Sequence, residues 1–293
     1  MGLGLPFEGT ICFRPETSYT VSTAAGPSWK PSDKVYDAKL DWGNTYKALR
    51  GISAPSVCGF ISTPSDYTLH VEWVSQSTSV SLASYCVNRT STGDLTSLAF
   101  SIGANVKGST KSYYALRGAK CKTFSIKAGK GEEMVCSADF SVASVIMGTS
   151  TTSTYGATIG TKYAAFNKAG TVVAKNTNVA IATITDSFNV TVNNNLQDYW
   201  TASSQYKQAA IPGALDVTGT VDISLDDGGG AFAAVSALYG ELTNIYVDQN
   251  LTAFGKLTLS SARFDGLTVD MNVSNDIIKT GQKFIAKYAR FST

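Results

Sequence analysis

Hydrophobic and polar residues alternate along much of this chain. Between residues 184 and 193, the apolar residues Ile184, Phe188, Val190 and Val192 share one side of an extended backbone, while serine, threonine and asparagine take the other side. Successive side chains of a β-strand point to opposite faces of the sheet, so this pattern predicts a half-buried strand.

A second alternating stretch follows at residues 216–226. Its apolar face is formed by Val217, Val221, Ile223 and Leu225. The opposite face carries three carboxylates in a row, Asp216, Asp222 and Asp226. A strand with this pattern would turn the three carboxylates toward water or a channel.

The same period of two recurs in other stretches that are separated by Gly, Asn, Asp or Ser turns. It is seen in Leu69/Val71/Trp73, Leu98/Phe100/Ile102/Ala104/Val106 and Leu267/Val269/Met271/Val273. Helix signals are scarce: the best is residues 231–239, after a glycine-rich breaker, and residues 32–49 are equally readable as an extended arm. The pattern predicts an antiparallel, all-β protein.

A polar tract rich in Ser, Thr and Gly at residues 148–160 separates two β-rich halves. We therefore expect an N-terminal β half with an N-terminal arm (1–146), a linker or insertion (147–180) and a C-terminal β half (181–293). Each half ends with a comparable pair of strands around glycines, which suggests two related modules, although the sequence identity between them is too low to establish a duplication.

The second half carries motifs that resemble a known family. The sequence F-x-V-x-V-N-N-N-L at 188–196 precedes a loop, then I-P-G-x-x-x-V-T-G-T-V-x-I-x-L-D-D at 211–227, and later A-R-F-D-G-L-T-V at 262–269. These segments resemble the tail tube proteins (major tail proteins) of long-tailed bacteriophages and related tailed viruses. The resemblance is strongest over residues 181–290 and looser over 67–142.

The resemblance implies a double β-sandwich or barrel module with a short flanking helix. It implies rings, usually hexameric, with a closed inner β-barrel, stacked into a tube through which the genome leaves the virion. The expected partners are other copies of the chain, a tape-measure protein, other tail proteins, and DNA that passes without specific binding. The expected location is the virion tail, assembled in the host cytoplasm and without a membrane.

Three groups of residues are candidates for roles in such a tube. Asp216, Asp222 and Asp226 are candidates to line the lumen, where carboxylates would repel phosphate and let a duplex slide. Tyr199, Trp200 and Tyr206 lie in a loop too long for a tight hairpin and are candidates for contact with the adjacent ring. The basic residues Lys107, Lys111, Arg117, Lys120 and Lys122 are candidates for contacts between subunits.

Each group also has a plainer interpretation. The aspartates would form an ordinary solvated sheet face or pair with the basic segment of a neighbouring subunit. The loop would pack on its own subunit. The basic segment, in which aromatic residues are interspersed, would be a solvated strand face or would contact nucleic acid.

Composition argues against enzymes and cofactors. Charged residues make up 16% of the 293 residues and the net charge is +2, so no global field favours nucleic acid or membranes. The five cysteines include no C-x-x-C pair, and we expect most of them to be reduced and partly buried. The N-terminal residues do not form a secretory signal. The single histidine, His70, lies on a polar strand face with no nucleophile motif nearby in sequence, so we expect no catalysis, metal or cofactor.

Three alternatives remain open from the sequence. One is a receptor-binding or adhesin-like β-sandwich with Tyr- and Asn-rich loops. Another is a β-sandwich carbohydrate hydrolase, which would need an exposed acidic pair beside stacked aromatic residues. The third is a related tail component, such as a tube-terminating ring protein, with the same fold.

Overall fold

The computed structural model describes residues 10–20, 30–31, 34–43, 46–50, 57–62, 64–74, 82–105, 111–129, 132–150, 170–175, 185–204, 206–225, 243–249, 256–270 and 278–292. Nearly all regular structure in these ranges is antiparallel β-strand, with one short helix. The expected all-β class is therefore confirmed.

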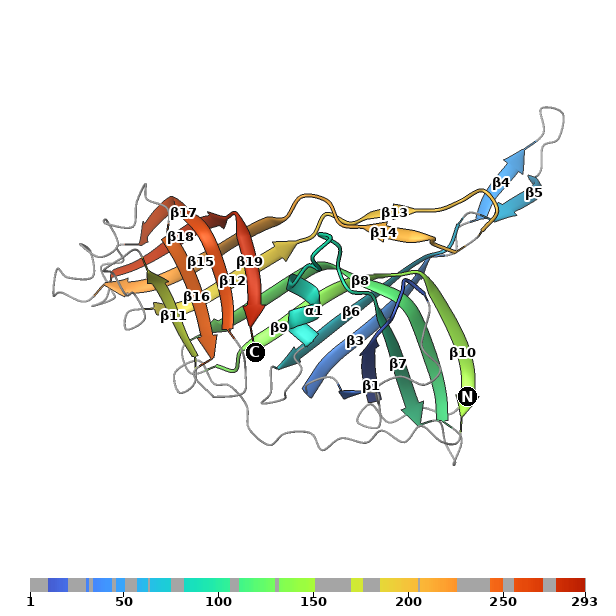
Figure 1. The fold of residues 1–293 in the computed structure, drawn as a ribbon, viewed down its shortest axis with the longest axis horizontal. Helices are drawn as coiled ribbons and strands as arrows, with labels where there is room; N and C mark the ends of the chain where they lie inside the picture. The colour runs from blue at the N-terminus through green and yellow to red at the C-terminus, as the bar shows by residue number, and fades with distance from the viewer. Residues whose placement is uncertain are drawn as a thin grey trace.

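A continuous antiparallel sheet, here called the long sheet, runs through the molecule (Figure 1). Its strands follow the order β3, β6, β9, β8, β12, β15, β18 and β17, each paired with the next. Their bounds are Lys34–Gly43 (β3), Asp66–Val74 (β6), Val135–Val142 (β9), Lys111–Gly129 (β8), Thr185–Asn193 (β12), Asp216–Leu225 (β15), Ile278–Ala286 (β18) and Lys256–Asp270 (β17).

The two longest strands, β8 and β17, leave the long sheet part of the way along and join a second layer. The first part of β8 pairs with β7 and β10, and β1 and β2 extend that layer; the first part of β17 pairs with β16 and β19, and β11 extends that layer. The bounds are Thr10–Pro15 (β1), Lys30–Pro31 (β2), Leu98–Asn105 (β7), Ser144–Ser150 (β10), Gly170–Lys175 (β11), Thr243–Gln249 (β16) and Tyr288–Ser292 (β19).

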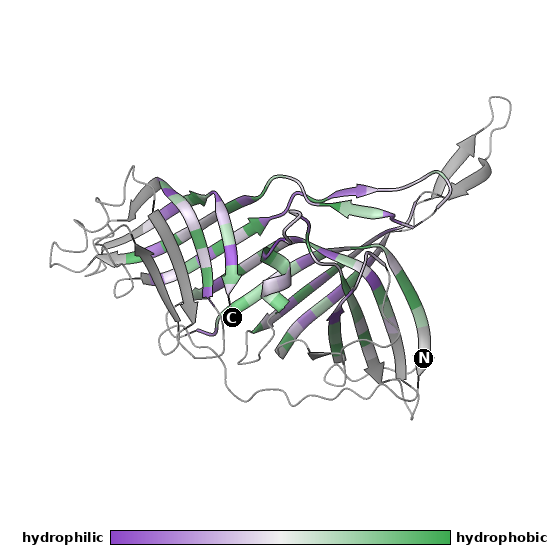
Figure 2. Ribbon diagram, in the orientation of Figure 1, coloured by the Kyte–Doolittle hydropathy of each residue, from purple (hydrophilic) through white to green (hydrophobic). Residues whose placement is uncertain are grey.

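Each second layer covers one half of the long sheet, and the apolar faces of the strands meet between the layers. Figure 2 shows hydrophobic and hydrophilic residues alternating along the strands. Leu69, Val71 and Trp73 of β6 are fully buried, as are Val221 and Ile223 of β15, to within 1%. The predicted inward faces of these two strands are confirmed, and the opposite face of the long sheet is left polar.

Two hairpins and one helix complete the described structure. The hairpin β4–β5 (Tyr46–Arg50 and Val57–Ser62) lies between β3 and β6 in the chain, and β13–β14 (Gln197–Tyr199 and Ala209–Ile211) lies between β12 and β15. In Figure 1, β13–β14 runs along the upper margin of the molecule, and β4–β5 extends beyond it at the upper right. The helix α1 (Leu82–Val87) follows β6 and was not expected from the sequence, whereas the expected helix at 231–239 lies outside the described residues.

The strand pairing of the first half is repeated in the second half. We call β1, β3 and β6–β10 with α1 the first module, and β11, β12 and β15–β19 the second module. The pairs β1–β7, β3–β6, β6–β9, β8–β9, β7–β8 and β8–β10 correspond in order to β11–β16, β12–β15, β15–β18, β17–β18, β16–β17 and β17–β19. Two related modules, suggested by the sequence, are therefore present as a repeated topology.

The irregularities of the strands repeat at the same register positions. The shift between Val35 and Asp37 in β3 corresponds to that between Thr185 and Ser187 in β12. The shift between Leu98 and Phe100 in β7 corresponds to that between Thr243 and Ile245 in β16. The shift between Cys121 and Thr123 in β8 corresponds to that between Phe264 and Gly266 in β17. Because a β-bulge is a specific local feature and not a general property of sheets, this agreement indicates an internal duplication.

Regular structure extends into the expected linker at both ends. The strand β10 continues to Ser150, and β11 occupies Gly170–Lys175 as an edge strand of the second module. The segment 32–49, for which helix and extended arm were both open, contains β3 and the first part of β4. Among the described residues of a single chain the long sheet does not close into a barrel.

Candidate functional site

The polar face of the long sheet is the first candidate surface in the described part of the chain. It is built by every second residue of each strand, because the alternate residues are needed for the core. In β15 this face carries Asp216, Thr218 and Asp222, all exposed. Two of the three aspartates flagged in the sequence therefore share one face, and Asp226 lies outside the described residues.

Each of the two aspartates has a polar neighbour on β12 or its end. One carboxylate oxygen of Asp216 accepts a hydrogen bond from the side-chain amide of Asn195 at 2.6 Å. The carboxylate of Asp222 accepts a short hydrogen bond from the Ser187 hydroxyl. These bonds fix the orientation of the two carboxylates, which stay exposed to solvent.

The polar face also carries basic side chains, so it is not uniformly acidic. Lys127 and Lys283 are exposed on it, and Lys39 forms an exposed ion pair with Asp41 at 2.9 Å. His70 lies on the same face, with its Nδ1 atom 2.7 Å from the Asp139 carboxylate. A surface of interspersed charges holds phosphate less strongly than a basic groove does.

The triple-asparagine motif forms the neck of the β13–β14 hairpin. Asn194 is fully buried, and its amide donates hydrogen bonds to the backbone carbonyls of Cys86 and Cys121 at 3.0 and 3.1 Å. Asn195 adopts a left-handed backbone conformation and its amide bonds the carbonyl of Ala214 across the neck. Asparagine suits this position because it tolerates positive φ and supplies a donor.

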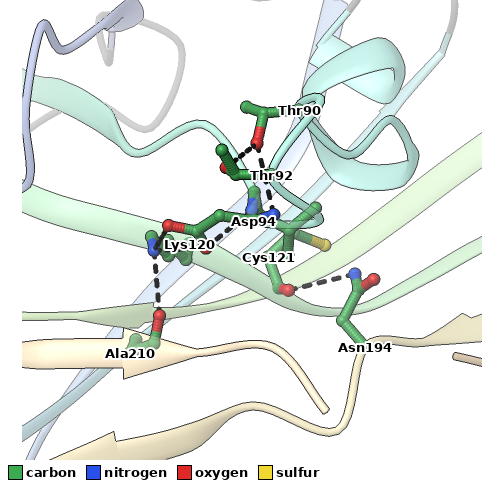
Figure 3. Close-up of polar contacts among 8 residues, drawn as sticks. Thr90, Thr92, Asp94, Lys120, Cys121, Asn194 and Ala210 are labelled. Carbon is green, nitrogen blue, oxygen red and sulfur yellow. Dashed lines mark hydrogen bonds and ion pairs between the residues drawn. The ribbon is translucent and has the colours of Figure 1, made fainter. Parts of the chain in front are cut away.

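Lys120 ties the hairpin to the first module. Its Nζ atom lies 2.7 and 2.8 Å from the Asp94 carboxylate oxygens and donates to the Ala210 carbonyl at 2.9 Å (Figure 3). The side chain is only 7% exposed. Figure 3 shows Lys120 between the Asp94 loop and the strand of Ala210, while Asn194 reaches the Cys121 carbonyl.

A second buried lysine, Lys207, holds the far part of the hairpin. Its side chain is 0% exposed, and its Nζ atom donates to Asp198 at 2.7 Å, to Asp66 at 3.2 Å and to the Ser141 hydroxyl. The same atom lies 5.4 Å from the Trp200 ring centroid, within the range of a cation–π contact. All three donors of the ammonium group are used, which is what permits its burial.

The three aromatic residues flagged in this loop fall into two groups. Tyr199 and Tyr206 are 56% and 42% exposed, so they are available for contact with another molecule. Trp200 is half-buried against Lys207 and belongs partly to the subunit's own structure. The loop thus packs on its own subunit along one side and presents tyrosines on the other.

Where the structure describes their side chains, the basic residues predicted to contact other subunits differ in environment. Lys122 is exposed and Arg117 is half-buried, whereas Lys120 is bound inside its own subunit. Lys111 lies in β8, and Lys107 lies outside the described residues. The role of Lys120 was missed because a lysine next to other basic residues in a strand predicts exposure, and its partner Asp94 is 26 residues away.

The described residues offer little for other chemistry. They contain no group of three or more His, Cys, Asp and Glu side chains that could hold a metal ion. Cys12, Cys86, Cys121 and Cys136 are buried as free thiols, and burial raises the pKa of Cys12 to about 11. No helix in the described ranges is long and apolar enough to cross a membrane.

Comparison with known proteins identifies the family. No curated protein sequence matches the chain. A family model described as phage tail tube protein matches residues 8–237, which is most of the chain and includes the first module, the neck asparagines, the β13–β14 hairpin and the polar face of β15. The chain therefore belongs to the phage tail tube protein family, as the sequence motifs predicted.

Proposed function

We propose that this protein closes into rings that stack to form the tube of a viral tail, the conduit for the ejected genome. The observation that carries the proposal is the long sheet, an extended antiparallel surface with one buried face and one polar face, in a chain of the tail tube family. Closure of such sheets into a barrel removes exposed strand edges and encloses a polar bore.

In this proposal the polar face lines the bore. Asp216 and Asp222 face the passing duplex, and lysines such as Lys127 and Lys283 moderate the repulsion. The mixture of charges favours passage of DNA without tight binding, since strong binding requires several unopposed cations along the phosphates. The protein then acts mechanically and has no catalytic step.

The two hairpins suit contacts along the tube axis. Both lie at the upper margin of the molecule in Figure 1, and Tyr199 and Tyr206 of the β13–β14 hairpin are exposed. Stacking on the next ring would bury these tyrosines, a residue type enriched at interfaces. A tape-measure protein inside the growing tube and assembly in the host cytoplasm complete the proposed context.

Electron microscopy of the purified protein over a range of concentrations, with mass determination on the same samples, tests this function. Hollow tubes or rings with an open centre are the expected result. Rings that never stack at any concentration would favour a tube-terminating role instead. Compact monomers or trimers without a central hole, even with tail extracts added, would contradict the proposal and favour a binding module.

A further inference from the structure

The long sheet ends at two strands that lack a neighbour on one side. The strand β3 pairs only with β6, and residues 263–270 of β17 pair only with β18, among the strands that the structure describes. Both edges are long, and long unpaired edges attract further strands. The internal duplication indicates which strand pairs with each edge.

Inside one chain, the two modules are joined by pairing between two strands of this kind, one from each module. Inside the chain, the second part of β8 pairs with β12, with Val192 opposite Phe124 and Asn193 opposite Thr123. The repeated topology makes β17 the counterpart of β8, and β3 the counterpart of β12. The unpaired edge of β17 therefore corresponds to β8 in this joint, and the unpaired edge of β3 corresponds to β12.

We infer that the outer edge of β17 in one chain pairs with β3 of the next chain, antiparallel and in the register of the β8–β12 joint. That register places Gly43 opposite Gly266, Asp41 opposite Thr268 and Lys39 opposite Asp270. The occupant of each edge is a second copy of this chain.

The exposure of β3 supports this assignment. Val192 of β12 is 0% exposed, whereas its counterpart Trp42 of β3 is 41% exposed. Ala38 is also exposed, although its counterpart Phe188 is buried. The same face of the same strand is covered in the second module, where β8 flanks it, and left open in the first.

A second contact across the internal joint shows the same asymmetry. Phe291 of β19 is 3% exposed, and its backbone exchanges hydrogen bonds of 2.8 and 2.7 Å with the Asn88 side-chain amide, just after α1 of the first module. Its counterpart in β10 is Met147, which is 60% exposed. In a ring, the second module of the preceding chain would cover Met147.

The number of chains in the ring follows from the size of the bore and rests on the proposed function. With strands about 4.8 Å apart and tilted by about 40°, barrels closed by the eight strands of two, three or six chains have backbone diameters of about 32, 48 and 96 Å. Side chains of about 5 Å on each wall leave roughly 22, 38 and 86 Å, against a duplex roughly 20 Å wide. Of these three sizes, the ring of three chains gives the bore that admits hydrated DNA without excess width.

Three chains supply six modules, so the sixfold arrangement expected of the family would be reached with half the number of subunits. The hexameric stoichiometry implied by the sequence resemblance then describes modules and not chains. The joints alternate around such a ring: three lie within chains, between β8 and β12, and three lie between chains, between β17 and β3.

Disulfide cross-linking tests the joint and the ring number together. The full-length variant Asp41→Cys/Thr268→Cys places thiols opposite each other, and Leu40→Cys/Val269→Cys does so one position along. Adjacent pairs of an antiparallel ladder differ in spacing, so one of the two has the closer geometry that a disulfide needs. The single variants and the off-register Asp41→Cys/Asp270→Cys are the matched controls, since the described native cysteines are buried.

The expected result, after mild oxidation and a non-reducing denaturing gel, is a ladder that stops at three chains in at least one on-register variant and not in the controls. A ladder that continues to six chains would overturn the ring number. Rings seen by microscopy without any cross-link in either on-register variant would overturn the joint while leaving the proposed function intact. The absence of both rings and cross-links would contradict the joint and the proposed function together.

Discussion

Gly118 and Ser261 occupy equivalent positions of the two modules and share a left-handed backbone, with φ of 66° and 55°. They lie where β8 and β17 pass from the second layer into the long sheet. The hydrogen bonds beside them are equivalent too: the Ala143 amide donates to the Arg117 carbonyl, and the Lys287 amide donates to the Ser260 carbonyl. Both modules therefore make the same turn between layers with different residues.

Gly118→Ala should lower the free energy of unfolding by about 2–4 kcal/mol, because it combines left-handed strain with overpacking. A Cβ atom there would lie 2.7 Å from the Cβ of Ala143 and 3.0 Å from Thr20 Cγ2. Gly93 has a φ of 82° with nothing within 4 Å, so Gly93→Ala is the control for backbone strain alone, at about 1 kcal/mol. Equal losses for the two variants in urea unfolding would show that the space around Gly118 is not tight.

Lys207→Met should destabilise the subunit by about 2–4 kcal/mol, because it leaves Asp198 without its buried cation. The loss is smaller than for a fully buried pair, since Asp198 is 22% exposed and Asp66 is 62% exposed. Lys39→Met is the matched control: its ion pair with Asp41 is exposed on both sides and should contribute less than about 1 kcal/mol. The double variant Lys207→Met/Asp198→Asn should recover part of the loss; an unchanged loss would show that the charge pair is not its source.

Replacing Tyr199 and Tyr206 together with Ser should shorten or abolish tubes while leaving the unfolding midpoint of the subunit nearly unchanged. Both side chains are exposed, so few contacts within the subunit are lost. Trp200→Ser is a poorer test, because it also removes the contact with the Lys207 ammonium. Microscopy of tube length, with urea unfolding as the control, decides it: wild-type tube length in the tyrosine variant would exclude the hairpin from ring stacking.

How far the sequence predicts this structure depends on what each position requires. Burial requires only an apolar residue at every second position, so the inward faces of β6 and β15 could be read directly from the sequence. Because a buried position accepts many different residues, the duplication is hidden in the sequence. Leu69 corresponds to Gly219 and Trp73 to Ile223, so the strand pairing is repeated while the side chains are not. Bulges and register, which show the repeat, leave little trace in the sequence.

The contacts that hold the hairpin were also beyond reach of the sequence. Lys207 lies in a polar loop, where lysine is normally solvated, and its partner Asp66 is 141 residues away. The helix α1 has only six residues, with no acidic residue in its first turn and no basic residue in its last, so it carries no terminal charge signal. The asparagine motif was flagged only through the family resemblance, and the structure supplies its physical reason at the hairpin neck.

Cys12 should react slowly with iodoacetamide in the folded protein, because the thiolate is the reactive species and burial raises its pKa from 9.0 to about 11. At pH 8 the thiolate fraction is then roughly a hundredfold lower than in the unfolded chain. As the pH rises, the thiol ionises first in the unfolded chain. Its contribution to the free energy of unfolding is therefore complete below pH 9 and is lost as the pH rises toward 11. The pKa of Cys86 is also raised, mainly by burial and then by its hydrogen bond with Cys121.

Peptide mass analysis after timed labelling measures the Cys12 rate, with labelling in urea as the reference. Urea unfolding of wild type and Cys12→Ala between pH 8 and pH 10.5 measures the linkage, and the variant should lose less stability over that range. Parallel pH profiles for the two proteins, together with rapid labelling of folded Cys12, would contradict the burial of this thiol.

Met147→Glu should prevent ring closure without unfolding the subunit. Met147 is 60% exposed in the isolated chain, so a carboxylate there is solvated and should change the free energy of unfolding by less than about 0.5 kcal/mol. In the inferred joint the same position is covered, as Phe291 is within the chain, and an unpaired charge would have to be desolvated there. Ile211→Glu, at a similar exposure of 57% but on the hairpin, is the control: it should affect stacking and leave single rings closed. Closed rings of Met147→Glu in electron micrographs, at wild-type yield, would place β10 outside the joint between chains.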